Sequence, residues 1–327
     1  MRFVIFGAGA VGSVIGGRMQ QHASGHGHEV TLVARGPHCA AIERDGLTIH
    51  DPQGSDVIRV RAVERIDQVT LADGDVVVLA MKTQDTEAAL DQLALHAPPG
   101  IGVVCAQNGV ENERLALRHF GRVYGVCVIL PAAFMEPGVI DASGAPHNAI
   151  LDVGRYPSGV DAMSYAIAGA FEASGLASRS VPDVMRWKYA KLMMNLGNAA
   201  DALVSDTEHL SSLLRPARAE AEACFAAAGI ARASDDEDRA RRADVMEVRP
   251  ILDPSRTRDG GSTWQSLARG ATTTEVDWLN GEIVLLGRLH GVPTPMNQLL
   301  CEAARRAAAT GVAPRSLTTA QLLAGEW

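Results

Sequence analysis

The stretch FVIFGAGAVGS, residues 3–13, places three glycines directly after a short apolar run and ahead of a helix-like segment. Gly7, Gly9 and Gly12 form the pattern G-x-G-x-x-G in the strand–turn–helix context that this pattern requires. The first glycine allows a tight turn, the second lets the backbone approach a pyrophosphate, and the third lets the helix pack on the strand. The helix N-terminus then offers N–H groups and partial positive charge to phosphates. The stretch predicts a dinucleotide-binding βαβ fold whose cofactor contacts Gly7, Ala8, Gly9, Ala10, Val11 and Gly12.

The rest of the first half alternates short apolar runs with helix-like segments. The sequence predicts strands at 2–6, 30–33, 76–79, 102–105, 123–128 and 150–157, and helices near 11–21, 87–95, 112–119 and 164–173. Such alternation is typical of a parallel sheet with helices on both faces. We therefore expect an α/β fold, with a Rossmann-type doubly wound sheet over residues 1–180.

From about Val181 the pattern becomes almost entirely helical, with helices expected at 183–204, 208–228, 262–290 and 296–310. The polar segment 233–261 is interpreted as a loop with at most short helices. The sequence thus predicts an all-α C-terminal domain over residues 181–327, with the boundary near residues 178–182.

The composition excludes some classes of function. The 327 residues carry a formal net charge of −8, which argues against a general binder of nucleic acid or of membrane surfaces. No apolar run reaches the length of a membrane span. The N-terminal stretch lacks a separate charged region and a cleavage site, so we expect no signal peptide. Five scattered cysteines without a C-x-x-C pair suggest reduced thiols, and hence a cytoplasmic protein.

The end of the second strand indicates which dinucleotide binds. In VTLVARGPH, residues 30–38, Arg35 stands where an NAD-binding protein usually has an acidic residue for the ribose 2′-hydroxyl. A cation there suits a 2′-phosphate, so we expect NADP(H) rather than NAD or FAD. The alternative is a surface arginine at the end of a strand. The nearby loop HASGHGHE, residues 22–29, holds three histidines but no completing ligand set, and we expect no metal.

Polar side chains follow two further strands. The stretch VVVLAMKTQDT, residues 76–86, delivers Lys82, and GVVCAQNGVEN, residues 102–112, delivers Gln107 and Asn108. Ligands of open α/β sheets bind outside the carboxyl ends of the strands, so these side chains are candidates for contact with cofactor or substrate. For Asn108 the alternative is turn formation, because Asn-Gly is a common turn.

The stretch KYAKLMMNLGNA, residues 188–199, reads as an apolar helix interrupted by three polar residues. At about 100° per residue, Lys191, Asn195 and Asn198 fall on one stripe of such a helix. A cation and two neutral donors in line suit an anionic substrate. The alternatives are a lysine that reaches out to solvent and asparagines that bond neighbouring helices. Lys188, on the adjoining flank, is the second candidate for a proton donor.

Six motifs, GAGAVGS, VARG, MKTQDT, QNGVEN, KLMMN and TTTEVDWLNGEIV, occur in an order and spacing that resemble the ketopantoate reductase (2-dehydropantoate 2-reductase) family. The resemblance extends from Met1 to about Gln298. It implies a Rossmann domain followed by an all-α domain like the C-terminal domain of 6-phosphogluconate dehydrogenase. It also implies NADPH-dependent reduction of a 2-keto acid to a 2-hydroxy acid, with 2-dehydropantoate, a precursor of pantothenate, as the first candidate substrate.

The resemblance assigns catalytic and cofactor roles by motif. Lys191 of KLMMN would be the proton donor, and Glu275 of TTTEVDWLNG would be the carboxylate near both the cofactor and that lysine. Asn108 would contact both NADPH and substrate. In PAAFMEPGVI, residues 131–140, Ala133 would contact the nicotinamide side of the cofactor through its backbone.

The substrate side follows the family less closely. Asn195 matches a substrate-binding amide, and Thr263, with Ser262 beside it, stands where the family has a substrate-binding hydroxyl. The pantoate-forming enzyme has a second asparagine four residues after the first, where this chain has Ala199; Asn198 lies one residue earlier. Two alternatives therefore remain: a reductase of another small keto acid, and a non-catalytic NADP(H)-sensing protein. The apolar helical half is compatible with a homodimer.

Overall fold

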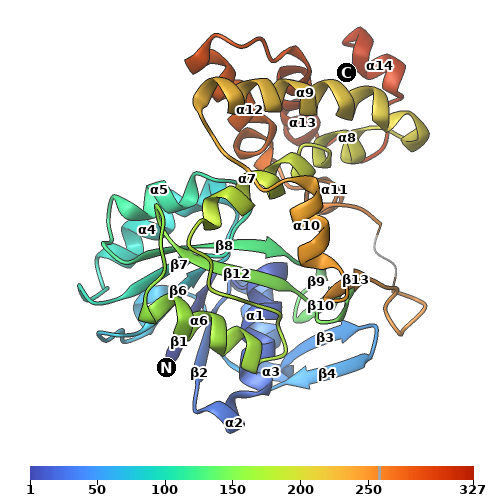
Figure 1. Cartoon of the computed structure of the whole chain (residues 1–327). Coiled ribbons are helices and arrows are strands. Elements are labelled where there is room, and N and C mark those ends of the chain that lie inside the picture. Colours follow the sequence, from blue (N-terminus) through green and yellow to red (C-terminus); the bar gives the residue numbers. More distant parts are fainter. Residues whose placement is uncertain (257–258) are drawn as a thin grey trace. The chain divides into compact units, whose positions relative to one another are not determined.

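The computed structural model describes residues 1–256 and 259–327, and the chain divides into two compact units (Figure 1). The first, the α/β unit, comprises Met1–Lys188 and Ser234–Arg258. The second, the helical unit, comprises Tyr189–Ala233 and Asp259–Trp327. Each unit has a hydrophobic core of its own.

A mostly parallel sheet forms the centre of the α/β unit. Within the described residues it has seven strands in the order β12-β8-β7-β6-β1-β2-β5, and only β12 runs antiparallel to its neighbour. The strands are β1 (Arg2–Phe6), β2 (Glu29–Val33), β5 (Arg61–Val63), β6 (Val76–Leu79), β7 (Gly102–Cys105), β8 (Val123–Ile129) and β12 (Ile150–Arg155). The expected Rossmann-type sheet is confirmed.

Both faces of the sheet are covered, which explains why its strands are apolar at nearly every position. Side chains alternate along β1, so that Phe3 and Ile5 join one buried cluster while Val4 and Phe6 join another. Helices α1 (Ala10–Gln21) and α6 (Ala162–Ala173) cover the first face. Helices α4 (Thr86–Ala94) and α5 (Asn112–Leu117) cover the second.

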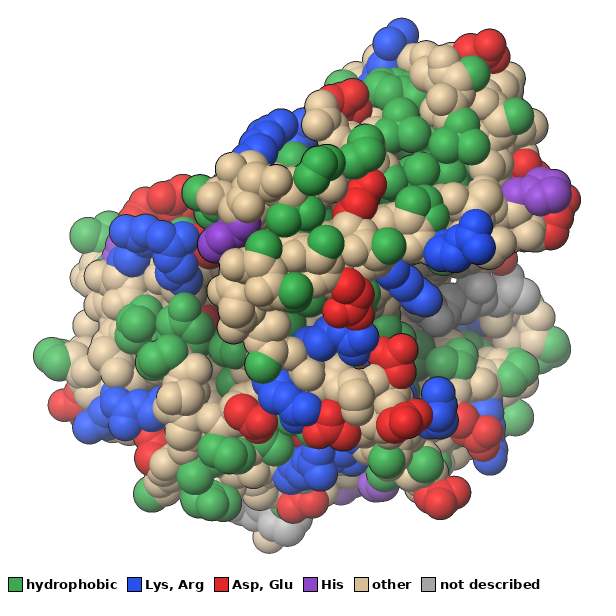
Figure 2. All heavy atoms as spheres, turned by 45° about the horizontal axis from the view of Figure 1, so that its top comes forward, with side chains coloured by type: hydrophobic (Ala, Val, Ile, Leu, Met, Phe, Trp, Pro, Cys, Tyr) green, Lys and Arg blue, Asp and Glu red, His purple; other side chains and the backbone are tan. Residues whose placement is uncertain are grey.

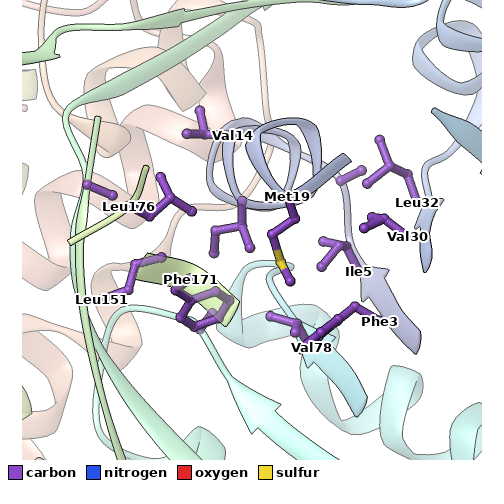
Figure 3. Close-up of a cluster of buried hydrophobic side chains, with 14 of the residues drawn as sticks. Phe3, Ile5, Val14, Met19, Val30, Leu32, Val78, Leu151, Phe171 and Leu176 are labelled. Atoms are coloured by element: carbon purple, nitrogen blue, oxygen red, sulfur yellow. The ribbon is translucent and has the colours of Figure 1, made fainter. Parts of the chain in front are cut away.

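Helix α1 holds the first cluster together (Figure 3). Val14 and Met19 from α1 are packed among strand residues such as Phe3 and beside Phe171 of α6. Phe171 is fully buried, and burial of a side chain of this size contributes about 2–3 kcal/mol of stability. The helix that begins at the glycine-rich turn is thus fixed firmly against the sheet.

A second sheet lies beyond the elements that the sequence predicts. Within the described residues it has four strands in the order β4-β3-β10-β9. These are β3 (Leu47–Asp51), β4 (Gly54–Ile58), β9 (Ala132–Glu136) and β10 (Val139–Ala142). The α/β unit also contains α2 (Ala23–His26), α3 (Gly36–Asp45), and the 3₁₀ turns η1 (Ile66–Gln68) and η2 (Thr83–Asp85).

Residues 234–258, the returning segment, belong to the α/β unit although they follow much of the helical unit in sequence. This segment forms α10 (Asp235–Arg242) and β13 (Met246–Val248), and β13 pairs antiparallel with β11 (Gly144–Pro146). Two ion pairs fix α10. Arg241 Nε and Nη2 donate to the carboxylate of buried Asp152 at 2.8 and 2.7 Å, and Arg186 binds Glu237 in the same two-pronged way at 2.8 and 2.6 Å.

The division of the chain therefore differs from the expected break near residue 180. The α/β unit continues to Lys188. The segment expected as a loop with at most short helices, which does contain the short helix α10, returns to this unit. The reason is that the charges of the segment find partners on this unit and that β13 pairs with β11. The sequence pattern showed the charges but not their partners, which lie 89 residues away for Arg241 and Asp152.

The helical unit is all-α, as expected. It contains the end of α7 (Val184–Asn195), then α8 (Asn198–Leu203), α9 (Leu210–Ala228), α11 (Ser262–Ala268), α12 (Asn280–His290), α13 (Pro295–Thr310) and α14 (Thr319–Ala324). The 3₁₀ turns η3 (Thr207–His209) and η4 (Glu275–Trp278) lie between them. Its core is rich in alanine, which lets the helices approach closely, as at Ala199, Ala200 and Ala304.

Two of the expected long helices are interrupted. The helix expected over 183–204 breaks at Leu196–Gly197, because the buried Asn280 side chain donates to the Leu196 carbonyl at 3.1 Å and glycine is a weak helix former. The helix expected over 262–290 ends at Ala268, where Gly270 takes a φ of +70°. It resumes only after the η4 turn.

The surface carries both signs of charge. Figure 2 shows Lys and Arg side chains interspersed with Asp and Glu on the face in view. Hydrophobic side chains also reach the surface, for example Leu285 and Leu289 of α12. Within residues 1–256 and 259–327, no helix is both long enough and apolar enough to cross a membrane.

Candidate functional site

The glycine-rich turn connects β1 to α1 and is pinned to the end of β2. The N–H groups of Gly7 and Ala8 both donate to the Val33 carbonyl, at 3.1 and 3.0 Å. Gly7 has a φ of +97°, and a Cβ there would lie 2.5 Å from the backbone nitrogen of Met81. Only glycine fits this position, because both the backbone conformation and the space demand it.

The other two glycines differ in what surrounds them. A Cβ at Gly12 would lie 2.5 Å from the Gly7 carbonyl oxygen, so the turn itself requires glycine there. A Cβ at Gly9 would meet nothing within 4 Å, and Gly9 caps α1 without a side-chain hydrogen bond. The space over Gly9 and the N–H groups of the first turn fit a pyrophosphate. The residues present therefore fit a dinucleotide.

A buried chain of hydrogen bonds supports the glycine-rich turn, and the sequence pattern did not predict it. Gly138 N–H donates to Nδ1 of His38 at 2.8 Å, and His38 Nε2 lies 3.1 Å from Ser13 Oγ, which in turn donates to the Ala8 carbonyl at 3.0 Å. Because Nδ1 accepts, the ring proton of neutral His38 lies on Nε2. The chain ties the glycine-rich turn to the β9–β10 hairpin. His38 belongs to ARGPH, a stretch that carried no signal for it beyond following the second strand.

We expect this chain to make stability depend on pH. Burial lowers the pKa of His38 below its ordinary value. The stabilisation is therefore present above the unfolded-state pKa of about 6.5, and it is lost as the pH falls from there through the lower folded-state pKa. Urea unfolding between pH 8 and pH 5 should show a steeper loss of stability for the wild type than for His38→Gln. Equal slopes for the two proteins would contradict the role of His38.

Arg35 is the second residue after β2 and immediately precedes α3. Its side chain is exposed, and its backbone is extended. Its neighbour Ala34 donates its N–H to the carbonyl of Val63, the last residue of β5. Val33, the residue before Ala34, accepts the hydrogen bonds of the glycine-rich turn. In Rossmann folds, the residue at the end of the second strand recognises the ribose of the adenosine.

A buried network of amides and hydroxyls joins the ends of β6 and β7. Gln107 Nε2 donates to the Met81 carbonyl at 3.0 Å and to Thr86 Oγ1 at 2.7 Å. Asn112 Nδ2 donates to the Asn108 carbonyl at 3.0 Å and to Thr83 Oγ1 at 3.2 Å. The backbone beside Lys82 and that of Asn108 are thus held together at one edge of the sheet. Gln107, expected to face a ligand, donates into this network instead.

Ala133 lies in β9, where it pairs with Asp141 of β10. It is buried, and it belongs to the four-stranded sheet rather than the seven-stranded one. The PAAFMEPGVI stretch that contains it is thus a hairpin, closed by Gly138 with a φ of +82°. The His38 chain described above fixes the closing turn of that hairpin.

In the helical unit, α7 carries Lys191 and Asn195 one turn apart on the same side of the helix. Lys191 is half-buried and Asn195 is buried. Asn198 does not continue their stripe, since the break at Gly197 makes it the first residue of α8. The expectation of a single stripe of three residues was therefore wrong for Asn198.

The structure brings Asn198 together with another predicted substrate residue. Asn198 Nδ2 lies 3.4 Å from Ser262 Oγ, at the start of α11. The next residue, Thr263, is buried. Gly261 N–H, 3.3 Å from Asp201 Oδ2, holds the start of α11 against α8. The Asn198 amide and the Ser262 hydroxyl thus meet where these two helices begin.

Glu275 is buried at the start of η4, where Thr274 Oγ1 caps the turn by accepting from Val276 N–H at 3.5 Å. It was expected on a continuous helix and lies instead in a 3₁₀ turn before α12. Its pairing with Lys191 stays a prediction. Lys188, the second candidate donor, forms a buried ion pair with Glu113 of α5.

No group of three or more metal-ligating side chains occurs in the described part of the chain. His22 is exposed, with Nδ1 3.0 Å from the Arg18 carbonyl. The side chain of His26 lies outside the described residues.

Comparisons with known proteins identify the family of the chain. Residues 3–157 match the family model "Ketopantoate reductase PanE/ApbA", and residues 183–308 match the model of its C-terminal domain. A 2-dehydropantoate 2-reductase of Pyrococcus horikoshii is 27% identical over 310 residues, which cover 92% of this chain and 95% of that one.

Solved structures show the same fold. A PanE/ApbA family ketopantoate reductase from Ralstonia eutropha JMP134 superposes with a TM-score of 0.77 at 28% identity, covering 95% of this chain and 99% of that chain. A D-mandelate dehydrogenase bound to NADH and anilino(oxo)acetate gives a TM-score of 0.79 at 21% identity, with the same coverage, a likeness of fold alone. Because the two family models together span most of the sequence, this chain belongs to the PanE/ApbA ketopantoate reductase family.

Proposed function

We propose that this protein reduces a 2-keto acid to a 2-hydroxy acid with NADPH, and that the keto acid is 2-dehydropantoate, which gives pantoate for pantothenate biosynthesis. One observation carries the proposal: the glycine-rich turn, the backbone beside Lys82 and the backbone of Asn108 lie at the carboxyl ends of β1, β6 and β7. Hydrogen bonds hold all three there. Family membership and relatives named 2-dehydropantoate 2-reductase support the reaction class. Five buried free thiols are in keeping with a cytoplasmic setting.

The α/β unit would hold the cofactor. The turn at residues 7–12 would bind the pyrophosphate, and Arg35 would bind the 2′-phosphate of NADPH. Lys82, Asn108 and the Ala133 backbone would contact the rest of the cofactor. The family resemblance adds Glu275, which belongs to the helical unit, as a further contact. These residues would hold the nicotinamide cofactor, whose chemistry would be the transfer of a hydride to the keto carbon.

The helical unit would supply the proton and most contacts to substrate. Lys191 Nζ gives a proton to the oxygen of the reduced carbon and so neutralises its developing charge. Glu275 keeps the ammonium protonated and oriented. Asn195, Asn198, Ser262 and Thr263 bind the carboxylate and hydroxyl of the keto acid by donating hydrogen bonds, without added charge.

The experiment that tests this function follows NADPH oxidation by absorbance with 2-dehydropantoate, pyruvate and 2-ketoisovalerate in parallel. Efficient turnover of 2-dehydropantoate above the others is expected. Turnover of another keto acid alone would make that acid the substrate in place of 2-dehydropantoate. The position of Asn198, one residue before that of the family's second asparagine, would then explain the difference. Tight NADPH binding without any turnover would favour the sensing protein and contradict the enzyme.

Arg35 gives a separate test of the cofactor. Arg35→Ala should weaken NADPH binding about tenfold or more, because a charged hydrogen bond of roughly 1.5–3 kcal/mol is lost, while NADH affinity should stay unchanged. Affinities are measured by fluorescence titration. Arg122→Ala is the matched control, since this exposed arginine precedes β8 at the opposite end of the strands. An equal loss for both cofactors would contradict binding of the 2′-phosphate by Arg35.

A further inference from the structure

A fully buried ion pair joins the beginning of α7 to α5 within the α/β unit. Lys188 is 3% exposed and Glu113 is 0% exposed. Lys188 Nζ lies 2.5 Å from Glu113 Oε1 and 3.0 Å from the carbonyl oxygen of Gln107. Gly125 of β8 leaves room for the carboxylate, because a Cβ there would lie 3.1 Å from Glu113 Oε1.

Such a pair is not explained by stability. Removal of two charges from water costs several kcal/mol per ion, and apolar residues of the same volume are often equally or more stable. Burial raises the pKa of the Glu113 carboxyl, and the Lys188 ammonium opposes that rise. A buried ion pair that costs free energy suggests a role other than stability. The contact of Lys188 with the Gln107 carbonyl indicates what that role is.

That third contact is the peptide beside Asn108. Lys188 holds the Gln107 carbonyl, on the N-terminal side of Asn108. Glu113 follows Asn112, whose side chain holds the Asn108 carbonyl on the other side. The ion pair therefore links the two groups that fix the backbone before and after Asn108.

We propose that Lys188 and Glu113 are positioning residues that fix the Gln107–Asn108 peptide, and with it the Asn108 side chain. The proposal rests on the proposed function, in which Asn108 contacts both NADPH and the keto acid. Both side chains are buried, so neither would touch either ligand. Their effect on the reaction passes through the backbone of residues 107–112.

The test is the double variant Lys188→Met/Glu113→Gln, which removes both charges and leaves no buried ion unpaired. A shift of a reacting contact by about 1 Å can cost on the order of 10²-fold in rate, so kcat/KM should fall by about that factor. The KM for the keto acid should rise together with the fall in kcat. The matched control is Arg2→Met/Asp75→Asn, which removes an ion pair to a buried carboxylate at the amino ends of β1 and β6. The control should lose stability without these kinetic changes.

A milder variant guards against loss of folding. Gly125→Ala keeps both charges but crowds Glu113, and it should change the same constants in the same direction by a smaller factor. Wild-type constants in every folded variant, or equal changes in the Arg2/Asp75 control, would overturn the positioning role.

Amide hydrogen exchange separates this proposal from the proposed function. Without any ligand, exchange at residues 107–112 should accelerate in the Lys188/Glu113 double variant and not in the control. If the wild type reduces no keto acid, the proposed function fails, and this readout still decides the positioning role. Unchanged exchange in that segment would overturn it.

Discussion

Replacement of Lys191 by alanine is expected to lower kcat by about 10²–10⁴-fold while NADPH affinity stays near that of the wild type. A positioned acid typically contributes this factor, because it neutralises the charge that hydride transfer leaves on oxygen. The lysine is half-buried on α7 in the helical unit, one turn before the buried Asn195. The glycine-rich turn belongs to the α/β unit and is held by bonds to Val33, so the variant should keep the turn that would bind NADPH. The measurement is single-turnover NADPH oxidation, with cofactor affinity from fluorescence titration.

Met194→Ala is the matched control for Lys191, because Met194 lies on the same helix with an exposed side chain. It should leave kcat within a few-fold of the wild type. Turnover by Lys191→Ala at the level of this control would remove Lys191 as the proton donor. A loss of activity in Lys188→Met/Glu113→Gln would not make Lys188 the proton donor in place of Lys191, since that variant is expected to raise KM as well as lower kcat.

Replacement of Gly9 by valine is expected to abolish tight NADPH binding and to leave folding intact. The φ of −83° at Gly9 is open to any residue, and a Cβ there meets nothing within 4 Å. The new side chain would fill the space above the first turn of α1, where phosphate oxygens would approach. Loss of two charge-assisted hydrogen bonds at about 1.5–3 kcal/mol each corresponds to roughly a 10²-fold or greater loss of affinity.

Gly12→Ala provides the opposite pattern. Its Cβ would lie 2.5 Å from the Gly7 carbonyl oxygen, so this variant should lose stability before any ligand is added. Thermal unfolding and NADPH titration of both variants separate the two effects. Normal NADPH affinity in Gly9→Val would mean that the space over Gly9 does not receive the cofactor.

The sequence predicted features that depend on neighbours along the chain. Strands β1, β6 and β7 lie where apolar runs and turn residues placed them, and the glycine-rich turn has the geometry that its motif requires. The predicted site residues came from the family resemblance, and their roles stay predictions. The structure does bring two of them, Asn198 and Ser262, together.

What the sequence could not show depends on distant partners. The Lys188–Glu113 pair spans 75 residues, and the Ser13–His38 contact spans 25. Period and propensity carry no record of such contacts. The break after Leu196 has the same origin, because the amide that takes its carbonyl comes from Asn280, 84 residues later. Tertiary hydrogen bonds thus overrode a local helical pattern.

The returning segment also has a consequence for the order in which the chain folds. Asp152 is buried in β12, yet Arg241 reaches its carboxylate only after 89 more residues have been made; until then Arg179 is its nearer partner in sequence. At about 5–20 residues per second, a ribosome needs roughly 4–18 seconds to supply Arg241. The α/β unit therefore cannot be completed during synthesis as a contiguous N-terminal piece. Helices α8 and α9 of the helical unit are synthesised before the returning segment that completes the α/β unit.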